Sequence, residues 1–424
     1  MSSAAEKKII NKKGLISWCL YDWANSAFPT VITTFVFAAY FTKGVATDEI
    51  SGTSQWGYAL SLSAIAIAVV GPVLGAIADK LGRRKPWIFF FTVLTAVSCV
   101  SLWWVKPDSA FVVQALVAIV LANFSFEMGV IFYNALLPTL SPREYIGRWS
   151  GWGWGLGYGG GLLCLALVLV GFVQAEQPWF GLNKNAAEHL RVTGPIVAFW
   201  MMFFAWPLFI FIPDEKRNAK NWLESITDGI GDLKKTLQNI SHYRNVAWFL
   251  FARMMYTDGL NTLFAFGGIY AAATFGLTFS ELIIFGISLN VTAGIGALVF
   301  AWFDDYLGAK RTIISTIISL IVVSVIILII ENKMLFWIFG VSLGFFVGPA
   351  QSASRSMIAR LAPVNMRAEF FGLYAFSGKA TAFLGPAAVA FFADIYQSQR
   401  IGMATVVVFL VIGLLLMRKV PDIR

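Results

Sequence analysis

The sequence predicts an all-α membrane protein with twelve transmembrane helices arranged as two pseudo-symmetric six-helix bundles. Three observations lead to this fold class. Of the 424 residues, 58% are hydrophobic and only 13% are charged, whereas soluble proteins carry about 25% charged residues. The apolar residues are gathered into segments of the roughly 20 residues that a helix needs to cross a bilayer. Polar motifs of the first half recur, in order, in the second half, which indicates an internal duplication.

Twelve continuous apolar segments satisfy the length requirement, and all are far longer than the roughly 9–11 residues of a membrane-barrel strand. They cover residues 15–42, 57–79, 87–105, 109–137, 149–174 and 194–212, and then 246–271, 280–303, 312–331, 334–361, 368–393 and 401–418. We therefore divide the chain into an N-terminal bundle (1–213), a linker (214–245) and a C-terminal bundle (246–424).

The distribution of lysine and arginine predicts that both termini are cytoplasmic. With twelve crossings, 23 of the 32 cationic residues fall in cytoplasmic segments and only 6 in outside loops, as the positive-inside rule requires. The first apolar run is too long for the core of a signal peptide, so we interpret it as an uncleaved span. We expect a monomeric, integral multi-pass protein of a bacterial plasma (inner) membrane.

The linker contains an amphipathic pattern. Its apolar residues recur at intervals of three and four: Trp222, Ile226, Ile230, Leu233, Leu237 and Ile240. Such spacing predicts a helix with one apolar face, lying on the membrane surface or beneath the bundles. Its simplest role is to connect the two halves.

Several classes of function are disfavoured by the composition. The net charge of +9 is spread over short loops, so no basic domain for nucleic acid is expected. Cys19, Cys99 and Cys164 lie in apolar runs without paired spacing, and the two histidines, His189 and His242, are isolated. We therefore expect no disulfide, metal site or cofactor. A Walker A motif is also missing, so ATP does not drive the protein directly.

Ionisable residues inside membrane spans are expensive unless they are paired or functional. The candidate substrate-binding residues are Asp22, Asn25, Glu127, Asn134, Arg253, Asp258, Asn261, Gln351, Arg355 and Lys379. All but Lys379 lie on spans 1, 4, 7 and 10, which line the centre of a two-bundle fold. Because both charge signs are present, they suit a small zwitterion, with Glu127 or Asp258 as a proton relay. The alternative is that these charges form interhelical ion pairs that fix the packing.

A second polar motif lies between spans 2 and 3. It reads Gly75-x-x-x-Asp79-x-x-Gly82-Arg83-Arg84, and its counterpart in the second half comprises Ala301, Asp305, Gly308 and Lys310. Asp79 is expected to accept backbone N–H groups at the start of a neighbouring helix, while Arg83 and Arg84 bridge to acids such as Glu144. We interpret the motif as a cytoplasmic latch that gates the pathway.

Glycine patterns in the fifth span predict close helix packing. The glycines form two rows at intervals of four, Gly151-Gly155-Gly159 and Gly153-Gly157-Gly161. Rows of this kind let neighbouring helices approach closely and slide or rock. Gly385-Pro386 in the eleventh span predicts a kink or pivot.

Several strings together resemble a known family. They are YDWANSAF (21–28), GPVLGAIADKLGRRKPW (71–87), FYNALLP (132–138), SGWGWGLGY (150–158), ARMMYTDG (252–259), FGGIYA (266–271), GPAQSASRS (348–356) and FGLYAFSGK (371–379). The chain resembles the unknown major facilitator family, which is related to the fungal autophagy-associated vacuolar amino-acid effluxers. The resemblance implies the major facilitator fold, alternating access, and amino acids or similar zwitterions as substrates. The second-half loop departs from the general pattern at Ala301 and Asp304-Asp305.

The favoured function is therefore that of a secondary transporter, with a small-molecule substrate, protons as a candidate coupling ion and the lipid bilayer as surroundings. One alternative is a sensor or scaffold that has a transporter fold but does not transport. A second is an intramembrane lipid-modifying enzyme, which would need an acidic or histidine cluster at one membrane face. No span contains a histidine, and Asp304-Asp305 lacks a third acid, so we expect no enzymatic activity.

Overall fold

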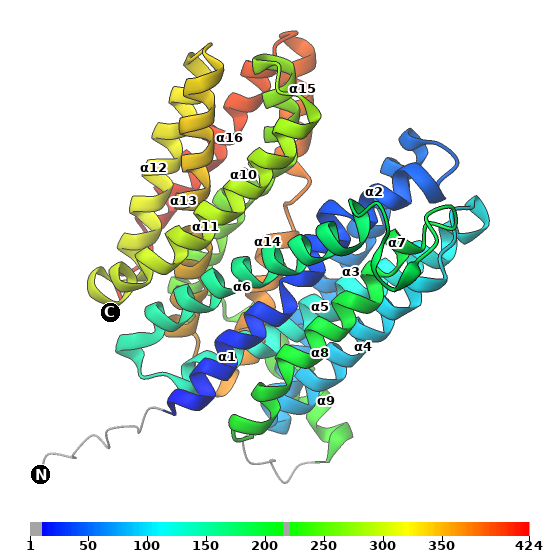
Figure 1. Ribbon diagram of the computed structural model, residues 1–424. Helices are drawn as coiled ribbons and strands as arrows, with labels where there is room; N and C mark the ends of the chain where they lie inside the picture. The colour runs from blue at the N-terminus through cyan, green and yellow to red at the C-terminus, as the bar shows by residue number, and fades with distance from the viewer. Residues whose placement is uncertain (1–10, 215–220, 424) are drawn as a thin grey trace, which may run out of the picture.

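The computed structural model describes residues 11–214 and 221–423, and helices account for nearly all of them (Figure 1). No strand occurs in these two ranges. The predicted all-α membrane fold is therefore confirmed. Eleven helical segments among the described residues are long and apolar enough to cross a membrane.

The first group of helices comprises a first span built of α1 (Lys12–Asn25), η1 (Phe28–Phe35), α2 (Phe37–Tyr40) and η2 (Phe41–Val45), followed by α3 (Glu49–Leu81), α4 (Lys85–Ser101), α5 (Val112–Leu140), α6 (Ile146–Val168) and α8 (Thr193–Phe211). A short helix, α7 (Glu188–Arg191), lies in the loop before α8. Helix α1 packs on α6 and α8, and α5 packs on α3 and α4.

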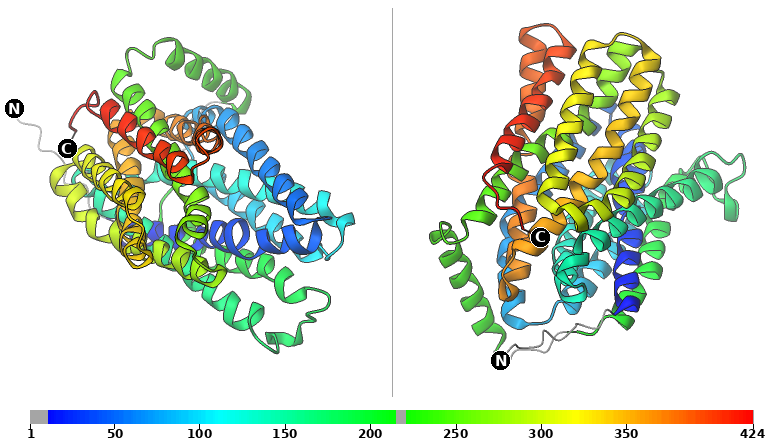
Figure 2. Two further views of the ribbon diagram at one scale, coloured as in Figure 1. Left: turned by 90° about the horizontal axis from the view of Figure 1, so that it is seen from above. Right: turned by 90° about the vertical axis from the view of Figure 1, so that its left-hand side faces the viewer.

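The second group comprises α10 (Arg244–Phe275), α11 (Phe279–Leu307), α12 (Ala309–Ile329), α13 (Lys333–Leu361), α14 (Arg367–Lys379), α15 (Leu384–Ile395) and α16 (Gln399–Met417). Helix α16 packs on α10 and α12, and α13 packs on α11 and α12. Helix α9 (Trp222–Gln238) connects the groups along the chain and stands beside both of them in Figure 2.

Helix α10 is the predicted seventh span, and it is the one span that falls outside the eleven apolar segments. Its 32 residues are long enough to cross the membrane. Arg253, Asp258 and Asn261 in its first two-thirds lower its mean hydropathy. Counting α10 gives the twelve crossings that the sequence predicts.

The eleventh span is broken. Helix α14 ends at Lys379 and α15 begins at Leu384, with a turn between them. The break comes directly before Gly385-Pro386, where the sequence predicts a kink. Proline lacks a backbone N–H, so a regular helix could not run through this point with its full set of hydrogen bonds.

The two groups approach each other at one end of the molecule and diverge toward the other (Figure 1). Helix α1 begins, α16 ends and α9 lies toward the end where they approach, which we call the α9 end. Across the junction, α3 packs on α14, and α6 packs on α11 and α13.

Candidate functional site

A cavity of about 560 Å³ lies between the two groups of helices. This volume is within the range of roughly 300–1,000 Å³ that is usual for small-molecule sites. Its walls come from α1, α5 and α6 on one side and from α10, α13 and α14 on the other. Nine of the ten predicted substrate-binding residues line it: Asp22, Asn25, Glu127, Asn134, Arg253, Asn261, Gln351, Arg355 and Lys379.

The most enclosed charges on the wall are Asp22 of α1 and Arg355 of α13, which form an ion pair across the two groups. Arg355 Nη1 lies 2.8 Å from Asp22 Oδ2, and the two side chains are 3% and 13% exposed. The same nitrogen donates to Asn134 Oδ1 at 3.3 Å. Asp22 and Arg355 therefore neutralise each other in this conformation and do not face the cavity as free charges.

The guanidinium of Arg355 has further partners that the sequence did not point to. Its Nε donates to Ser150 Oγ and its Nη2 to the Ser150 carbonyl oxygen, at 3.0 and 2.6 Å. The guanidinium carbon also lies 4.6 Å from the Trp18 ring centre and 5.5 Å from that of Trp154. Every nitrogen of the guanidinium is therefore bonded, and aromatic faces add a cation–π attraction. The tryptophan-rich start of α6, which contains Ser150 and Trp154, is the feature of the sequence that could have indicated these partners.

A second ion pair joins the groups between Glu127 of α5 and Lys379 at the end of α14. Lys379 Nζ lies 2.7 Å from Glu127 Oε1, and the two side chains are 29% and 21% exposed. Both residues line the cavity. This pair is therefore more accessible from the cavity than the Asp22–Arg355 pair is.

Arg253 of α10 is held differently. Its Nη1 donates to the Tyr374 carbonyl oxygen at 2.7 Å and to Ser377 Oγ at 2.8 Å. Its guanidinium carbon lies 3.5 Å from the centre of the Tyr374 ring. No carboxylate pairs with it among the described residues. Arg253 is thus the cation on the described cavity wall that retains an uncompensated charge.

The remaining predicted residues differ in their access to the cavity. Asn261 is exposed to it, whereas Asn25 is buried with its amide nitrogen unpaired. Gln351 accepts a hydrogen bond from the Tyr158 hydroxyl at 2.9 Å. Asp258 does not line the cavity. Its Oδ2 accepts the Gly385 N–H at 3.2 Å, so it binds the first turn of α15, where a negative charge is favoured.

At the α9 end, Asp79 of α3 makes the contact that the sequence predicts for it. Asp79 Oδ2 accepts the backbone N–H of Glu369, in the first turn of α14, at 2.9 Å. Its other oxygen accepts from Arg84 Nη2 at 3.0 Å. A carboxylate satisfies free N–H groups at a helix start, so Asp79 ties the two groups together.

Glycines allow α3 and α14 to approach this closely. A Cβ added to Gly75 would lie 2.3 Å from the carbonyl oxygen of Ala368, and one added to Gly372 would lie 2.6 Å from that of Gly71. Any larger side chain at these positions would force the two helices apart. Gly82 ends α3 with φ +78°, a left-handed conformation that only glycine adopts without strain.

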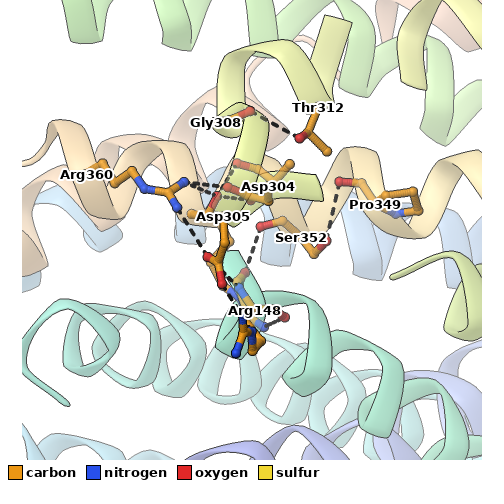
Figure 3. Close-up of polar contacts among 12 residues, drawn as sticks. Arg148, Asp304, Asp305, Gly308, Thr312, Pro349, Ser352 and Arg360 are labelled. Atoms are coloured by element: carbon orange, nitrogen blue, oxygen red, sulfur yellow. Dashed lines mark hydrogen bonds and ion pairs between the residues drawn. The ribbon is translucent and has the colours of Figure 1, made fainter. Parts of the chain in front are cut away.

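The counterpart in the second half uses Asp305 of α11 (Figure 3). Asp305 Oδ1 accepts the backbone N–H of Arg148, in the first turn of α6, at 3.0 Å. The neighbouring Asp304 bonds Arg360 and Ser356 within its own group. Asp305 also lies 3.7 Å from Arg360 Nη2 in its own group. Of the two aspartates, Asp305 is thus the one that bonds across the junction, while the polar partners of Asp304 lie in its own group. Gly308 begins the next helix with φ +93°.

Among the described residues, the predicted bridge from Arg83 and Arg84 to Glu144 is not formed, and these residues and Lys310 have other surroundings. Arg83 lies 3.9 Å from Asp214, and Arg84 bonds Asp79 within its own loop. Glu144 has no ion pair in the described part of the chain. Lys310 donates to the carbonyl oxygen of Arg418, at 3.5 Å, within the second group.

The two predicted glycine rows of α6 face different helices. Gly151 and Gly155 face α11, where an added Cβ would lie within 2.6 Å of Ala301 and Leu298. Gly153, Gly157 and Gly161 face α1, and Gly153 lies directly against Asp22 and Trp18. Gly159, the third glycine of the first row, faces Trp23 of α1 instead. Only the start of that row therefore packs across the junction, and the second row packs within the first group beside the Asp22–Arg355 pair.

Comparisons with known protein families agree with this geometry. Residues 143–423 match the family described as "Vacuole effluxer Atg22 like", and residues 2–165 match the "Major Facilitator Superfamily". The chain belongs to the Atg22-like family of major facilitator transporters. This family and its fold are those of transporters and not of enzymes.

The relatives and solved structures extend over nearly the whole chain. The uncharacterized MFS-type transporter YxiO of Bacillus subtilis is 28% identical, and the match covers 96% of this chain and 94% of YxiO. Autophagy-related protein 22 of Coccidioides immitis is 21% identical over 83% of this chain and 70% of its own length. The transporter FucP in its outward conformation aligns with a TM-score of 0.75 over 98% and 99% of the two chains, at 12% identity. The xylose symporter XylE aligns with a TM-score of 0.72 at 13% identity, over 97% and 96%. At these identities the two structures show a shared fold.

Proposed function

We propose that this protein is a secondary transporter that moves a small amino acid, or a similar zwitterion, across the membrane by alternating access. The observation that carries the proposal is Arg253. It is the cation on the described cavity wall that lacks an acidic partner, whereas Arg355 and Lys379 are paired with Asp22 and Glu127. A guanidinium in a cavity of low dielectric is the preferred group for binding a carboxylate.

The ammonium end of the substrate needs acceptors on the same wall. Glu127 supplies a carboxylate that lies partly open to the cavity, and the side-chain oxygens of Asn25 and Asn261 supply neutral acceptors. Binding of an ammonium group to Glu127 would displace Lys379 from it. Because this ion pair joins the two groups, substrate binding would change the contacts between them, which is what a ligand must do to shift a conformational equilibrium.

The two groups are proposed to act as the two moving bundles, residues 1–213 and 246–424. The glycine-lined contacts of α3 with α14 and of α6 with α11 close the α9 end, and Asp79 and Asp305 bond across that closure. The charge distribution favours a cytoplasmic location for this end. We infer that the structure represents the state that is closed to the cytoplasm, of a monomeric protein in a bacterial plasma membrane.

Protons are the proposed coupling ion, with Glu127 as the carrier. Glu127 lines the cavity and can lose its partner Lys379, whereas Asp258 is 2% exposed and away from the cavity. Glu127→Gln should bind the substrate more weakly, because its ammonium acceptor is then neutral, yet still exchange substrate at saturating concentration, while accumulation driven by a pH gradient is lost. Gradient-driven accumulation by Glu127→Gln at the wild-type level would exclude Glu127 as the proton carrier.

The carboxylate assignment is tested in proteoliposomes with a panel of radiolabelled amino acids and the matching amino-acid amides. Wild-type protein should transport an acid in preference to its amide. Arg253→Ala should lose this preference and at least ten-fold of its uptake. Arg244→Ala, which removes an exposed charge at the start of the same helix, serves as the matched control. Equal uptake by wild type and Arg253→Ala would contradict the assignment, and binding of ligands without any flux would indicate a sensor.

A further inference from the structure

Helix α9 has three distinct faces. The first face docks on the spans, and its residues are small or buried: Ser225, Gly229, Leu233 and Thr236. A Cβ added to Gly229 would lie 2.9 Å from the backbone nitrogen of Ile77 in α3. An ion pair between Asp232 and Lys80 fixes the same face.

The docked face lies across the junction between the two groups of helices. Leu233 packs with Ala76 of α3 and with Leu373 of α14, and Leu250 of α10 packs against this cluster. The helix therefore has a defined orientation, and its other faces point away from the spans.

The second face is apolar and uncovered. Leu223, Ile230 and Leu237 are 76%, 48% and 53% exposed, and they follow one another at intervals of seven, two full helical turns each. Lys234 lies on the same strip, beside Ile230 and Leu237 in a shallow hollow on the helix. The third face is polar and includes Glu224 and Lys235, both exposed.

The spans on which α9 docks also expose apolar residues. Helix α3 exposes Val69 two turns before its contact with α9, and α10 exposes Phe251 next to the docked Leu250. A helix with a protein-bound face, an apolar face and a polar face suits the boundary between lipid and water. In that position the apolar strip would lie in the acyl region while the polar strip faces the cytoplasm.

We propose that α9 binds the phospholipid surface of the membrane, with Leu223, Ile230 and Leu237 inserted at the acyl boundary. The long side chain of Lys234 covers apolar surface and carries its ammonium group to the lipid phosphates. This lipid site is independent of the transported substrate. A helix that contacts lipid would then lie across the junction between the two groups, which Asp79 and Asp305 hold closed.

Single cysteines with nitroxide labels test this orientation in full-length protein in phosphatidylglycerol–phosphatidylcholine nanodiscs. Ile230→Cys and Leu237→Cys report on the apolar face, and Glu224→Cys and Lys235→Cys are matched controls on the polar face. The native Cys19, Cys99 and Cys164 are buried, and a labelled sample without an added cysteine measures their background. Power saturation then compares accessibility to oxygen, which partitions into lipid, with accessibility to a water-soluble nickel chelate.

The oxygen-to-nickel accessibility ratio should be several-fold higher at positions 230 and 237 than at positions 224 and 235. Equal ratios at all four positions would overturn the proposal. Low accessibility to both reagents at positions 230 and 237, with dipolar broadening between labels, would show a second copy of the chain on this face and would also overturn it. Neither outcome depends on whether the protein transports an amino acid.

Discussion

The two ion pairs that cross the central cavity differ in one respect that separates their roles. The Asp22–Arg355 pair is 13% and 3% exposed, and every guanidinium nitrogen is bonded. The Glu127–Lys379 pair has a similar separation of 2.7 Å but is 21% and 29% exposed. Separation alone would class the pairs together, whereas their surroundings distinguish a closed pair from an accessible one.

The physical reason lies in the loss of hydration. A buried charge that loses its partner has no water to replace it, so breaking such a pair costs about 3–5 kcal/mol. A pair in contact with water loses much less, about 0–1 kcal/mol. The closed pair is thus suited to hold the two groups together, and the accessible pair is suited to exchange its partner for a substrate.

The largest effect is expected at the closed pair. Arg355→Met should lower the free energy of unfolding by about 3–5 kcal/mol, because Asp22 remains buried without a cation. Thermal unfolding in detergent, followed by circular dichroism, measures this loss. The double variant Asp22→Asn/Arg355→Met should recover most of it. If Arg355→Met alone were as stable as wild type, the closed pair would have no role in holding the structure.

The next largest effect is expected at the latch. Asp79→Asn removes the charge that binds the start of α14 and Arg84, and hydrogen bonds to charged groups contribute about 1.5–3 kcal/mol. The closed state at the α9 end should therefore lose at least ten-fold in population, and the protein should shift toward the inward-open state. Labelling of a cysteine placed in the cavity by a reagent added on the α9 side measures the shift. Asp394→Asn, which neutralises an exposed carboxylate on α15 away from the latch, is the control. An unchanged labelling rate in Asp79→Asn would contradict the latch.

The accessible Glu127–Lys379 pair should affect uptake more than stability, which is the reverse of the effect expected for the closed Asp22–Arg355 pair. Lys379→Met should change the free energy of unfolding by less than about 1 kcal/mol while reducing uptake about ten-fold, because Glu127 loses the partner that it exchanges. Uptake and thermal unfolding, both measured on the same preparation of Lys379→Met and of wild type, test this prediction. A stability loss as large as that of Arg355→Met would show that both pairs are structural.

The smallest effect is expected at Lys80–Asp232, the most exposed of these pairs, with side chains 31% and 34% exposed. The hydrogen bond from Lys80 lowers the pKa of Asp232. A depressed folded-state pKa stabilises the protein above the unfolded-state pKa, and this contribution is lost as the pH falls through the folded value. Solvent screening limits it to about 0.2–1 kcal/mol. Asp232→Asn should therefore lower the melting temperature slightly at pH 7 and by less at pH 3. An equal loss at both pH values would assign the effect to packing.

The sequence predicted the spans and the polar positions because both follow local rules. Apolar length determines a span, and an ionisable residue within a span must be paired or functional. The seventh span was predicted at residues 246–271 from its length, although the polar residues of α10 lower its mean hydropathy. The position of the α14–α15 break was visible as Gly385-Pro386.

The partners of those polar residues could not be predicted from the sequence. Asp22 and Arg355 are 333 residues apart in the chain, and no local pattern distinguishes Arg355 from Arg253 as the partner of Asp22. The cage of Trp18, Ser150 and Trp154 around Arg355 depends on how α1, α6 and α13 cross. Similarly, the apolar pattern of α9 was evident, but small residues such as Ser225 and Gly229 determine the face that docks.

The most direct test of the account is a distance measurement across the junction at the α9 end. Spin labels at Tyr145→Cys and Val364→Cys, which are exposed residues in the short turns just before α6 and α14, report on the separation of the two groups by pulsed electron resonance. The account predicts a short distance without substrate, and a second, longer distance whose population grows when a transported amino acid is added. Asp79→Asn should enlarge that population without substrate. A single distance that neither the amino acid nor Asp79→Asn changes would contradict alternating access in this protein.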